Sequence, residues 1–301
     1  MKGFCLTFTI QKENKGMLLR DFLKDKQISK AALVDIKFHG GALLVNGSAV
    51  TVRYPLQERD VVEVYFPIES PSEDLLAEDI PLDIVYEDEY VLVINKHAGI
   101  SSIPSREHRS RTLANGILHY YGLQGFQATI HIVTRLDRDT SGLMLIAKHR
   151  HAHHLFSLQQ KKFAVRRRYE AVVHGIVKEA VGTIDAPIGR KDTSIIEREV
   201  REDGQVAVTH YEVLKQGQAW SHLSLRLETG RTHQIRVHMA HIGHPLVGDT
   251  LYGGQKVGDL TRQALHSCEL TFFHPYLEKE LTFCSELPRD MKRMLDGGQG
   301  K

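Results

Sequence analysis

The hydrophobic and polar positions over residues 12–66 predict a small separate module. Apolar residues three or four apart between residues 19 and 36 predict two helices, the second of them capped by Ser29. The stretch ALLVNGSAV at 42–50 predicts a β-hairpin around its Asn-Gly pair. The apolar run DVVEVYF at 60–66 predicts the closing strand of the module.

A linker and a larger domain are predicted to follow. Residues 67–82 are rich in Pro, Ser and acidic residues, as linkers often are. Over residues 83–290 short apolar runs outnumber helical patterns, which predicts an α+β domain with a mixed, mainly antiparallel β-sheet. Residues 291–301 are assigned to a C-terminal tail. The helices expected in the large domain lie at 112–122, 149–162, 233–243 and 287–295.

Composition indicates an ordinary soluble protein with a basic face. The 301 residues are 42% hydrophobic and 25% charged, and the net charge is only +2. Residues 69–90 contain nine acidic residues and no Lys or Arg, whereas residues 148–168 contain seven Lys or Arg, four His and no acidic residue. Such a basic segment suits a phosphate-rich partner. Three widely spaced cysteines, no signal peptide and no long apolar run lead us to expect a cytoplasmic monomer without a membrane span.

The stretch HIVTRLDRDTSGLMLIAKH, residues 131–149, is the first candidate for chemistry. If its first half is extended, Arg135 and Asp137 point to the same face, and the cation keeps the carboxylate ionised. The turn-forming residues 140–142 would then fix the direction of Asp137. An oriented, ionised aspartate can serve as a nucleophile or a base. The residues alone are equally compatible with a structural ion pair at a turn.

The second candidate is the basic cluster GRTHQIRVHMAHIGH, residues 230–244. Arg231, His233 and Arg236 could pair with a carboxylate or hold phosphate, or they could form a basic surface helix. The histidines raise the possibility of a metal site. They do not form the His-Glu-x-x-His arrangement and no Cys pair assists them, so we expect no metal.

The third candidate is RRRYEAVVHG, in which Tyr169 follows Arg166, Arg167 and Arg168. A tyrosine beside arginines can stack on a base while the cations contact phosphate. It can equally be a half-buried strand residue. No phosphate loop, GxGxxG or GxSxG motif occurs, and we therefore expect no cofactor.

These motifs together resemble the RluA-like group of RNA pseudouridine synthases, ribosomal large subunit type, over about residues 83–290. The resemblance rests on LDIVYEDEYVLVINK, RLDRDTSGLMLIAK, RRRYEAVVHG, GRTHQIRVHMAHIGHPLVGDTLYG and ALHS, which occur in this order. It implies a catalytic domain with the pseudouridine synthase fold. The module at 12–66, with RDFL, ISKAALVDIKFHGG and LLVNGSAV, resembles the S4-like RNA-binding domain.

The resemblance also implies roles for individual residues. Asp137 becomes the catalytic aspartate, and Arg135 the neighbour that orders the site. Tyr169 becomes the aromatic residue that stacks on the target base and can accept a proton. Arg236 becomes the basic partner of Asp137, with Arg231 as the other candidate. Whether Asp137 attacks the nucleoside covalently or removes a sugar proton stays open.

Two positions depart from the family pattern: Thr134 stands where histidine is usual, and His97 where proline is usual. Neither belongs to the catalytic set. The expected function is isomerisation of uridine to pseudouridine in structured RNA, with 23S ribosomal RNA preferred. The alternatives are a synthase for transfer RNA, a non-catalytic RNA-binding or ribosome-assembly protein, and a metal-dependent RNA hydrolase. The expected RNA contacts are Arg20, Lys30, Arg138, Arg166, Arg167, Arg168, Arg231 and His233.

Overall fold

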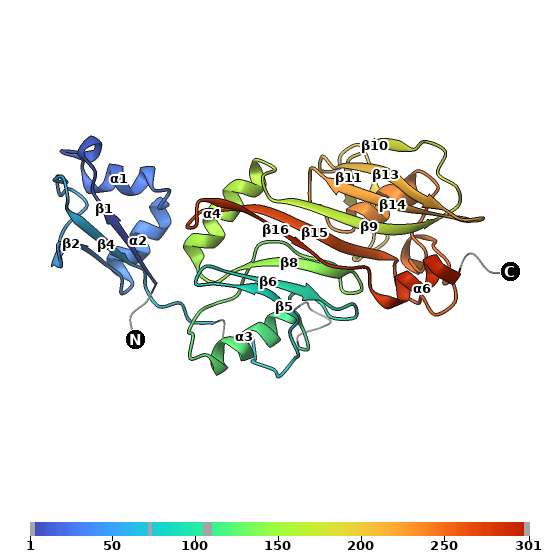
Figure 1. Ribbon diagram of the computed structural model, residues 1–301, viewed down its shortest axis with the longest axis horizontal. Helices are drawn as coiled ribbons and strands as arrows, with labels where there is room; N and C mark the ends of the chain where they lie inside the picture. Colours follow the sequence, from blue (N-terminus) through green and yellow to red (C-terminus); the bar gives the residue numbers. More distant parts are fainter. Residues whose placement is uncertain (1–3, 72–73, 105–109, 298–301) are drawn as a thin grey trace.

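The structure is a computed structural model that describes residues 4–71, 74–104 and 110–297. It has two parts along its longest axis, a small N-terminal module and a larger domain, joined by an extended segment (Figure 1). No helix in the described ranges is long and apolar enough to cross a membrane.

The N-terminal module packs two helices on a four-stranded sheet of order β1-β4-β2-β3. Ser29 caps the second helix, its hydroxyl accepting from the Ala32 N–H at 3.1 Å. At the predicted hairpin Asn46 and Gly47 both have positive φ, as a tight two-residue turn requires. The elements are β1 (Cys5–Thr9), η1 (Lys12–Asn14), α1 (Leu19–Asp25), α2 (Lys30–Phe38), β2 (Ala42–Val45), β3 (Ser48–Ala49) and β4 (Val61–Tyr65).

The start of this module at residue 12 was placed too late. Strand β1 pairs antiparallel with β4 along its whole length, from Cys5 opposite Tyr65 to Thr9 opposite Val61. Its side chain Leu6 is buried in the module's core. The run CLTFT is apolar enough for a strand, but only its pairing with β4 shows that it belongs to this module.

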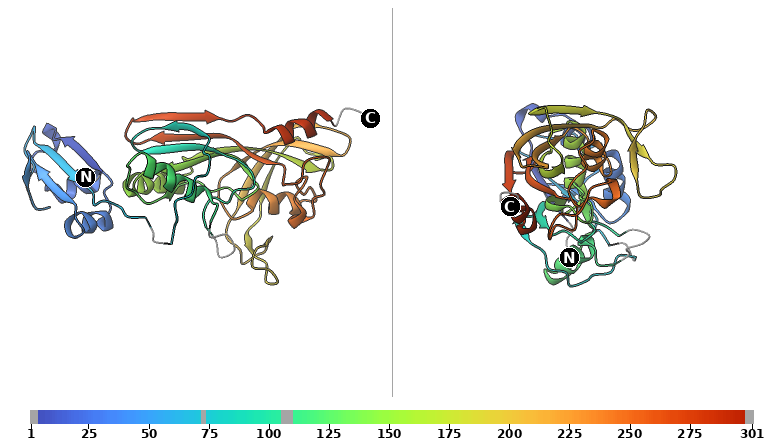
Figure 2. Two further views of the ribbon diagram at one scale, coloured as in Figure 1. Left: turned by 90° about the horizontal axis from the view of Figure 1, so that it is seen from below. Right: turned by 90° about the vertical axis from the view of Figure 1, so that its right-hand side faces the viewer.

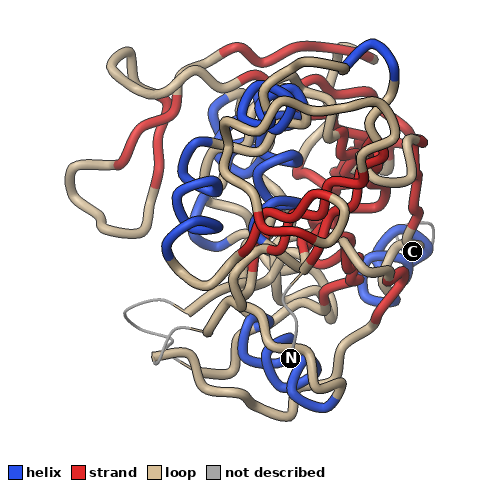
Figure 3. Tube along the Cα trace, turned by 90° about the vertical axis from the view of Figure 1, so that its left-hand side faces the viewer, coloured by secondary structure: helices blue, strands red, loops and turns tan. Residues whose placement is uncertain are grey.

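The large domain is built on a ten-stranded sheet whose main order is β10-β13-β14-β9-β15-β8-β6-β5. Its strands form the central red layer in Figure 3. Neighbours are antiparallel except β8 and β15, which run parallel, and the expectation of a mixed, mainly antiparallel sheet is confirmed. The strands are β5 (Ile84–Glu87), β6 (Val91–Lys96), β7 (His131–Ile132), β8 (Ser141–Ala147), β9 (Arg166–His174), β10 (Val181–Asp185), β13 (Val208–Gln216), β14 (Trp220–Leu227), β15 (Leu265–His274) and β16 (Lys279–Cys284).

Helices cover both faces of this sheet. On one face α3 (Leu113–Leu123) and α5 (Gln234–His241) pack on alternate residues of β6, β8 and β9. On the other face α4 (Arg150–Lys161) packs on β6, β8 and β15. Strand β8 is therefore buried on both sides, which explains its unbroken apolar sequence. A separate hairpin of β11 (Ile188–Arg190) and β12 (Arg198–Val200) projects from the domain in both views of Figure 2.

The segment assigned to a C-terminal tail is mostly helical. Helix α6 runs over Arg289–Gly297, so the expected helix lies where the sequence pattern put it, but it belongs to the domain. Its side chains Met291 and Leu295 are buried in a cluster with Val172 and Trp220. This packing overrides the polar composition of the segment, which suggested a tail.

The parallel pairing of β8 and β15 depends on a glycine at the start of β8. Gly142 has φ +113° and lies opposite Ser267. A Cβ atom at Gly142 would lie 2.2 Å from the Ser267 carbonyl oxygen. No side chain fits there, so Gly142 allows the loop of residues 133–140 to enter the centre of the sheet.

We predict that Gly142→Ala destabilises the large domain by more than about 2 kcal/mol, because positive φ and the contact with Ser267 act together. Gly122→Ala is the matched control: Gly122 lies in α3 with no atom near its added Cβ, and alanine should stabilise by up to about 1 kcal/mol. Urea unfolding followed by Trp220, the single tryptophan, measures both. Equal stabilities for the two variants would contradict the argument.

Candidate active site

The loop before β8 holds Asp137 between two anchored neighbours. The Ser102 hydroxyl donates to the Leu136 carbonyl at 2.7 Å. The Lys96 ammonium donates to the Arg138 carbonyl at 2.8 Å. Leu136 is itself buried in the core on the face of the sheet that α3 and α5 cover. The backbone on both sides of Asp137 is therefore fixed, and its side chain has little freedom to turn away.

The two positions that depart from the family pattern, Thr134 and His97, lie among the segments that hold the Asp137 loop. Lys96 also donates to the carbonyls of His97 and Ile100, so one buried ammonium gathers three backbone oxygens. Thr134 is 1% exposed, and its hydroxyl accepts from the Leu145 N–H at 2.8 Å. Thr134 thus acts at a strand end through its side chain, whereas His97 contributes only its backbone carbonyl, which proline would also offer.

Arg236 on α5 joins Asp137 to a second carboxylate. Its Nη1 donates to Asp137 Oδ2 at 3.1 Å, and its Nε and Nη2 donate to Asp249 at 2.7 and 2.8 Å. Arg236 is 6% exposed and Asp249 2% exposed. Burial opposes the charge of Arg236, but its hydrogen bonds to Asp249 and the charge of Asp137 outweigh this effect and raise the pKa of the guanidinium above its usual range. A bidentate buried pair of this kind fixes the guanidinium in place.

The cation that pairs with Asp137 is thus Arg236, the partner that the resemblance implied. Residues 135–137 are not in a strand, so the alternation that would put Arg135 and Asp137 on one face does not apply. Arg135 is exposed and lines two of the cavities that Asp137 lines, but no ion pair joins it to Asp137 in the described part of the chain. Arg231, the other candidate, donates through Nε to the Val206 carbonyl instead.

Tyr169 lies on β9 and faces the same small cavity as Asp137 and Arg236. The cavity measures about 70 Å³. Tyr169 is 3% exposed, and its ring is part of the core on the α5 side of the sheet. Its hydroxyl receives a long hydrogen bond of 3.4 Å from Arg167.

The three arginines before Tyr169 do not act as one patch. Because side chains alternate along β9, only Arg167 shares the face of Tyr169. The other two form ion pairs with carboxylates, which offset their charge. These pairs join Arg166 to Glu280, and Arg168 to Glu170 and Glu269.

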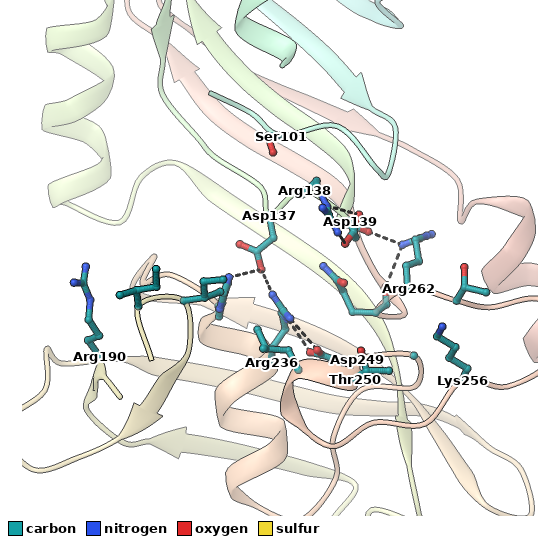
Figure 4. A pocket seen from close by; sticks show the side chains of 17 residues that line it. Ser101, Asp137, Arg138, Asp139, Arg190, Arg236, Asp249, Thr250, Lys256 and Arg262 are labelled. Atoms are coloured by element: carbon teal, nitrogen blue, oxygen red, sulfur yellow. Dashed lines mark hydrogen bonds and ion pairs between the residues drawn. The ribbon is translucent and has the colours of Figure 1, made fainter. Parts of the chain in front are cut away.

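Asp137 also lies where two cavities meet that are larger than the one beside Tyr169. It lines a cavity of about 970 Å³ towards the β11–β12 hairpin and another of about 980 Å³ towards α4. Figure 4 shows the first of these, with Asp137 and Arg236 between Arg190 and Lys256. The Asp137 Oδ2 atom faces Arg236, whereas Oδ1 forms no hydrogen bond with any described residue. The site therefore offers one free carboxylate oxygen in a space wide enough for a nucleotide.

Sequence reasoning missed several residues that support this site. Asp249 holds Arg236, and Tyr252 presents its ring to the Arg236 guanidinium at 5.0 Å. Arg262 donates to the Asp139 carbonyl at 3.1 Å and pairs with Asp290 of α6 at 2.7 Å. Asp249 and Tyr252 lie in the run GDTLYG, which contributes to the family resemblance but does not by itself predict a contact with Arg236.

The histidines of the basic cluster are spread over different contacts. His238 is buried between the Thr209 hydroxyl and the Ala186 carbonyl, and His244 faces the His174 carbonyl. His233 lies beside the site, with its Nε2 3.9 Å from Asp137 Oδ2. In the described ranges no three His, Cys, Asp or Glu side chains are grouped as metal ligands would be.

Comparison with known proteins defines the class. The model of the family described as RNA pseudouridylate synthase matches residues 90–241, and the chain belongs to this family. It is therefore an RNA pseudouridine synthase, an isomerase, as the sequence motifs indicated. The matched region includes Asp137, Tyr169 and Arg236.

Similar proteins extend over most of the chain. The "Uncharacterized RNA pseudouridine synthase YjbO" of Bacillus subtilis is 56% identical over 93% of this chain and 99% of its own length. "Ribosomal large subunit pseudouridine synthase D" of Pseudomonas aeruginosa is 41% identical over 85% of this chain and 83% of its own length. The solved structure of "Human RNA Pseudouridylate Synthase Domain Containing 4" shares the fold, with a TM-score of 0.59 and 24% identity over 72% of this chain and 92% of that one.

We predict that Arg236→Met lowers the stability of the large domain by about 3–5 kcal/mol, because Asp249 would remain buried and charged without its partner. The double variant Arg236→Met/Asp249→Asn removes that stranded charge and should recover part of the loss. Urea unfolding monitored through Trp220 measures both variants. A single variant as stable as the wild type would show that the buried ion pair does not support the fold.

Proposed function

We propose that Asp137 is the catalytic aspartate of this pseudouridine synthase. The observation that carries the proposal is the geometry of its carboxylate. Arg236 binds Oδ2 at 3.1 Å, and Oδ1 is directed into open space at the junction of the cavities. An ionised carboxylate with one oxygen restrained and the other free is suited to act as a nucleophile or base.

The reaction itself explains why such a site is enclosed and positively charged. Uracil must separate from C1′, turn and rejoin through C5, so it must stay trapped and shielded from water. The target nucleotide must first leave its stack, which costs a few kcal/mol. Tyr169 offers an aromatic surface at the cavity wall for the displaced base, and Arg135 lies at the entrance. The reaction is redox-neutral, so the residues of the chain can carry it without a redox cofactor.

Two routes are compatible with this arrangement. In one, Asp137 Oδ1 attacks C1′ and uracil leaves with the electrons of the glycosidic bond. In the other, Asp137 removes the proton from C2′ and the base departs by elimination. In both routes Arg236 holds Oδ2 of Asp137 while Oδ1 reacts.

We propose a structured RNA of the large ribosomal subunit as the substrate. The support is a group of relatives named "Ribosomal large subunit pseudouridine synthase D", about 40% identical over most of this chain. The N-terminal module adds support through its likeness to S4-like RNA-binding domains, with Arg20 and Lys30 exposed on its helices. Transfer RNA is the alternative substrate.

The remaining RNA contacts should come from cations around the cavities. Arg138, Arg167, Arg231 and His233 line the hollows that contain Asp137, and we propose that they contact the RNA. Arg166 and Arg168 stay as weaker candidates because both are ion-paired and line none of these cavities, whereas Arg138 lines two of them although it pairs with Asp139. Two further cations strengthen the proposal: Arg190 and Lys256 line the cavity in Figure 4 and pair with no carboxylate in the described part of the chain. Their place on either side of Asp137 suits the phosphates that flank a target uridine.

We predict that Asp137→Asn abolishes turnover and leaves RNA affinity within about threefold of wild type, since the change removes the reactive charge and keeps the shape. The measurement is tritium release from 5-tritiated RNA that lacks natural pseudouridine. Large-subunit ribosomal RNA and transfer RNA are compared as substrates. Full activity in the variant would refute the role of Asp137, and release from transfer RNA alone would refute the ribosomal substrate.

We predict that Arg190→Ala and Lys256→Ala each weaken RNA binding and reduce the slope of log affinity against log salt by about 0.7–0.9, the value for one phosphate contact. Binding to the inactive Asp137→Asn protein is measured from low to moderate salt. Lys279→Ala is the control, because Lys279 is exposed on β16 and lines none of the cavities that contain Asp137. A slope identical to that of the control would exclude these two phosphate contacts.

A further inference from the structure

His233 is held beside Asp137 by an unusual backbone conformation. It precedes the first residue of α5 and has φ 59° and ψ 18°, in the left-handed region that residues other than glycine seldom adopt. The conformation directs the imidazole to the Asp137 side of the helix, where Nε2 lies 3.9 Å from Oδ2. Strained residues of this kind persist where the surrounding contacts fix them, and they are common at active sites.

Tyr252 fixes the other side of the imidazole. The Tyr252 hydroxyl oxygen accepts the backbone N–H of Arg198 at 2.9 Å and lies 2.8 Å from His233 Nδ1. Because its oxygen already accepts one hydrogen bond, its own proton is free to be donated to Nδ1. In that tautomer Nε2 carries the remaining proton and points it towards Asp137. The opposite tautomer would set the Nε2 lone pair against a carboxylate, which is electrostatically unfavourable.

The two donors near Asp137, on Arg236 and His233, therefore both face its Oδ2 atom. Arg236 Nη1 binds Oδ2 at 3.1 Å, and His233 Nε2 lies 3.9 Å from the same oxygen, an electrostatic contact that is longer than a hydrogen bond. The carboxylate can then rotate little about its axis, and Oδ1 stays turned to the cavity. Holding a reacting atom in line in this way can change a rate about 100-fold.

We propose that His233 is a positioning residue for the aspartate chemistry: with its tautomer set by Tyr252, it restrains Asp137 Oδ2 and leaves Oδ1 as the reacting oxygen. This inference rests on the proposed catalytic role of Asp137. It differs from the RNA contact proposed for His233 above, because an RNA contact would act on binding, whereas a positioning contact acts on the chemical step.

The electrostatic surroundings keep His233 in the form that this role requires. The groups facing it are Asp137, Arg236, Asp249, Arg198 and Tyr252. Burial lowers the pKa of His233 below its ordinary value of 6.5, Arg236 and Arg198 act in the same direction, and Asp137 and Asp249 oppose them. The imidazole is therefore uncharged at neutral pH. Protonation at lower pH would turn it into a cation that competes for Asp137, so activity should fall as the pH drops.

Two substitutions of His233 distinguish a positioning role from a purely structural one. Asparagine tolerates the left-handed conformation, but its amide ends near the place of Nδ1 and does not reach Asp137. Glutamine places an amide N–H near the place of Nε2 and cannot titrate. We expect His233→Asn to lower kcat about 10- to 100-fold with KM within about threefold of wild type, and His233→Gln to recover most of the loss. Tyr252→Phe should lower kcat as well, because it removes the hydroxyl and keeps the ring beside Arg236.

The experiment measures kcat, KM and the pH profile of tritium release from 5-tritiated ribosomal RNA, with Trp220 unfolding as a check on folding. The wild type should lose activity on acidification at a higher pH than His233→Gln. Equal losses of kcat in both His233 variants, a change confined to KM, or identical pH profiles would overturn the proposal. If Asp137→Asn is inactive while His233→Asn behaves as wild type, only this inference fails. If Asp137→Asn is active, the proposed function fails first.

Discussion

One buried guanidinium, that of Arg236, holds the site together. It is only 6% exposed, so its charge is stabilised mainly by the carboxylates that surround it. Asp249, in the segment after α5, accepts two hydrogen bonds from this guanidinium, and Asp137, in the loop before β8, accepts a third. Helix α5 and the segment after it are thereby joined to the loop of Asp137, which lies 99 residues before Arg236 in the sequence. The ion pair that stabilises the fold also determines which oxygen of Asp137 is free.

The sheet gives this interaction a rigid base. The loop with Asp137 enters the sheet where β8 runs parallel to β15, and β15 runs antiparallel to β9, which carries Tyr169. Gly142 permits the close contact with Ser267 that this entry requires. Because β8 is buried on both faces, the loop cannot shift without disturbing two hydrophobic cores. The projecting β11–β12 hairpin contributes Arg190, Ile195 and Ile196 to the wall of one of the large cavities beside Asp137 (Figure 2).

Much of the fold could be predicted from local patterns. The hairpin at Asn46-Gly47 and the helices of the module follow from turn chemistry and periodicity, which act over a few residues. The two boundaries that failed depend on distant partners. Strand β1 is defined by pairing with β4, and helix α6 joins the domain because Met291 and Leu295 meet an apolar surface that their own segment does not reveal.

The sequence by itself determined the chemical class of the site, because Asp137, Tyr169 and Arg236 lie in distinctive motifs that set the residue types and their order. Tertiary structure decided which of the candidate cations meets Asp137. Arg135 is two residues from Asp137 and does not pair with it, whereas Arg236 is 99 residues away and does. Asp249 showed no sign in sequence of its contact with Arg236. An ion pair in a folded core depends on distance and on exclusion of water, and both are properties of packing that residue order does not contain.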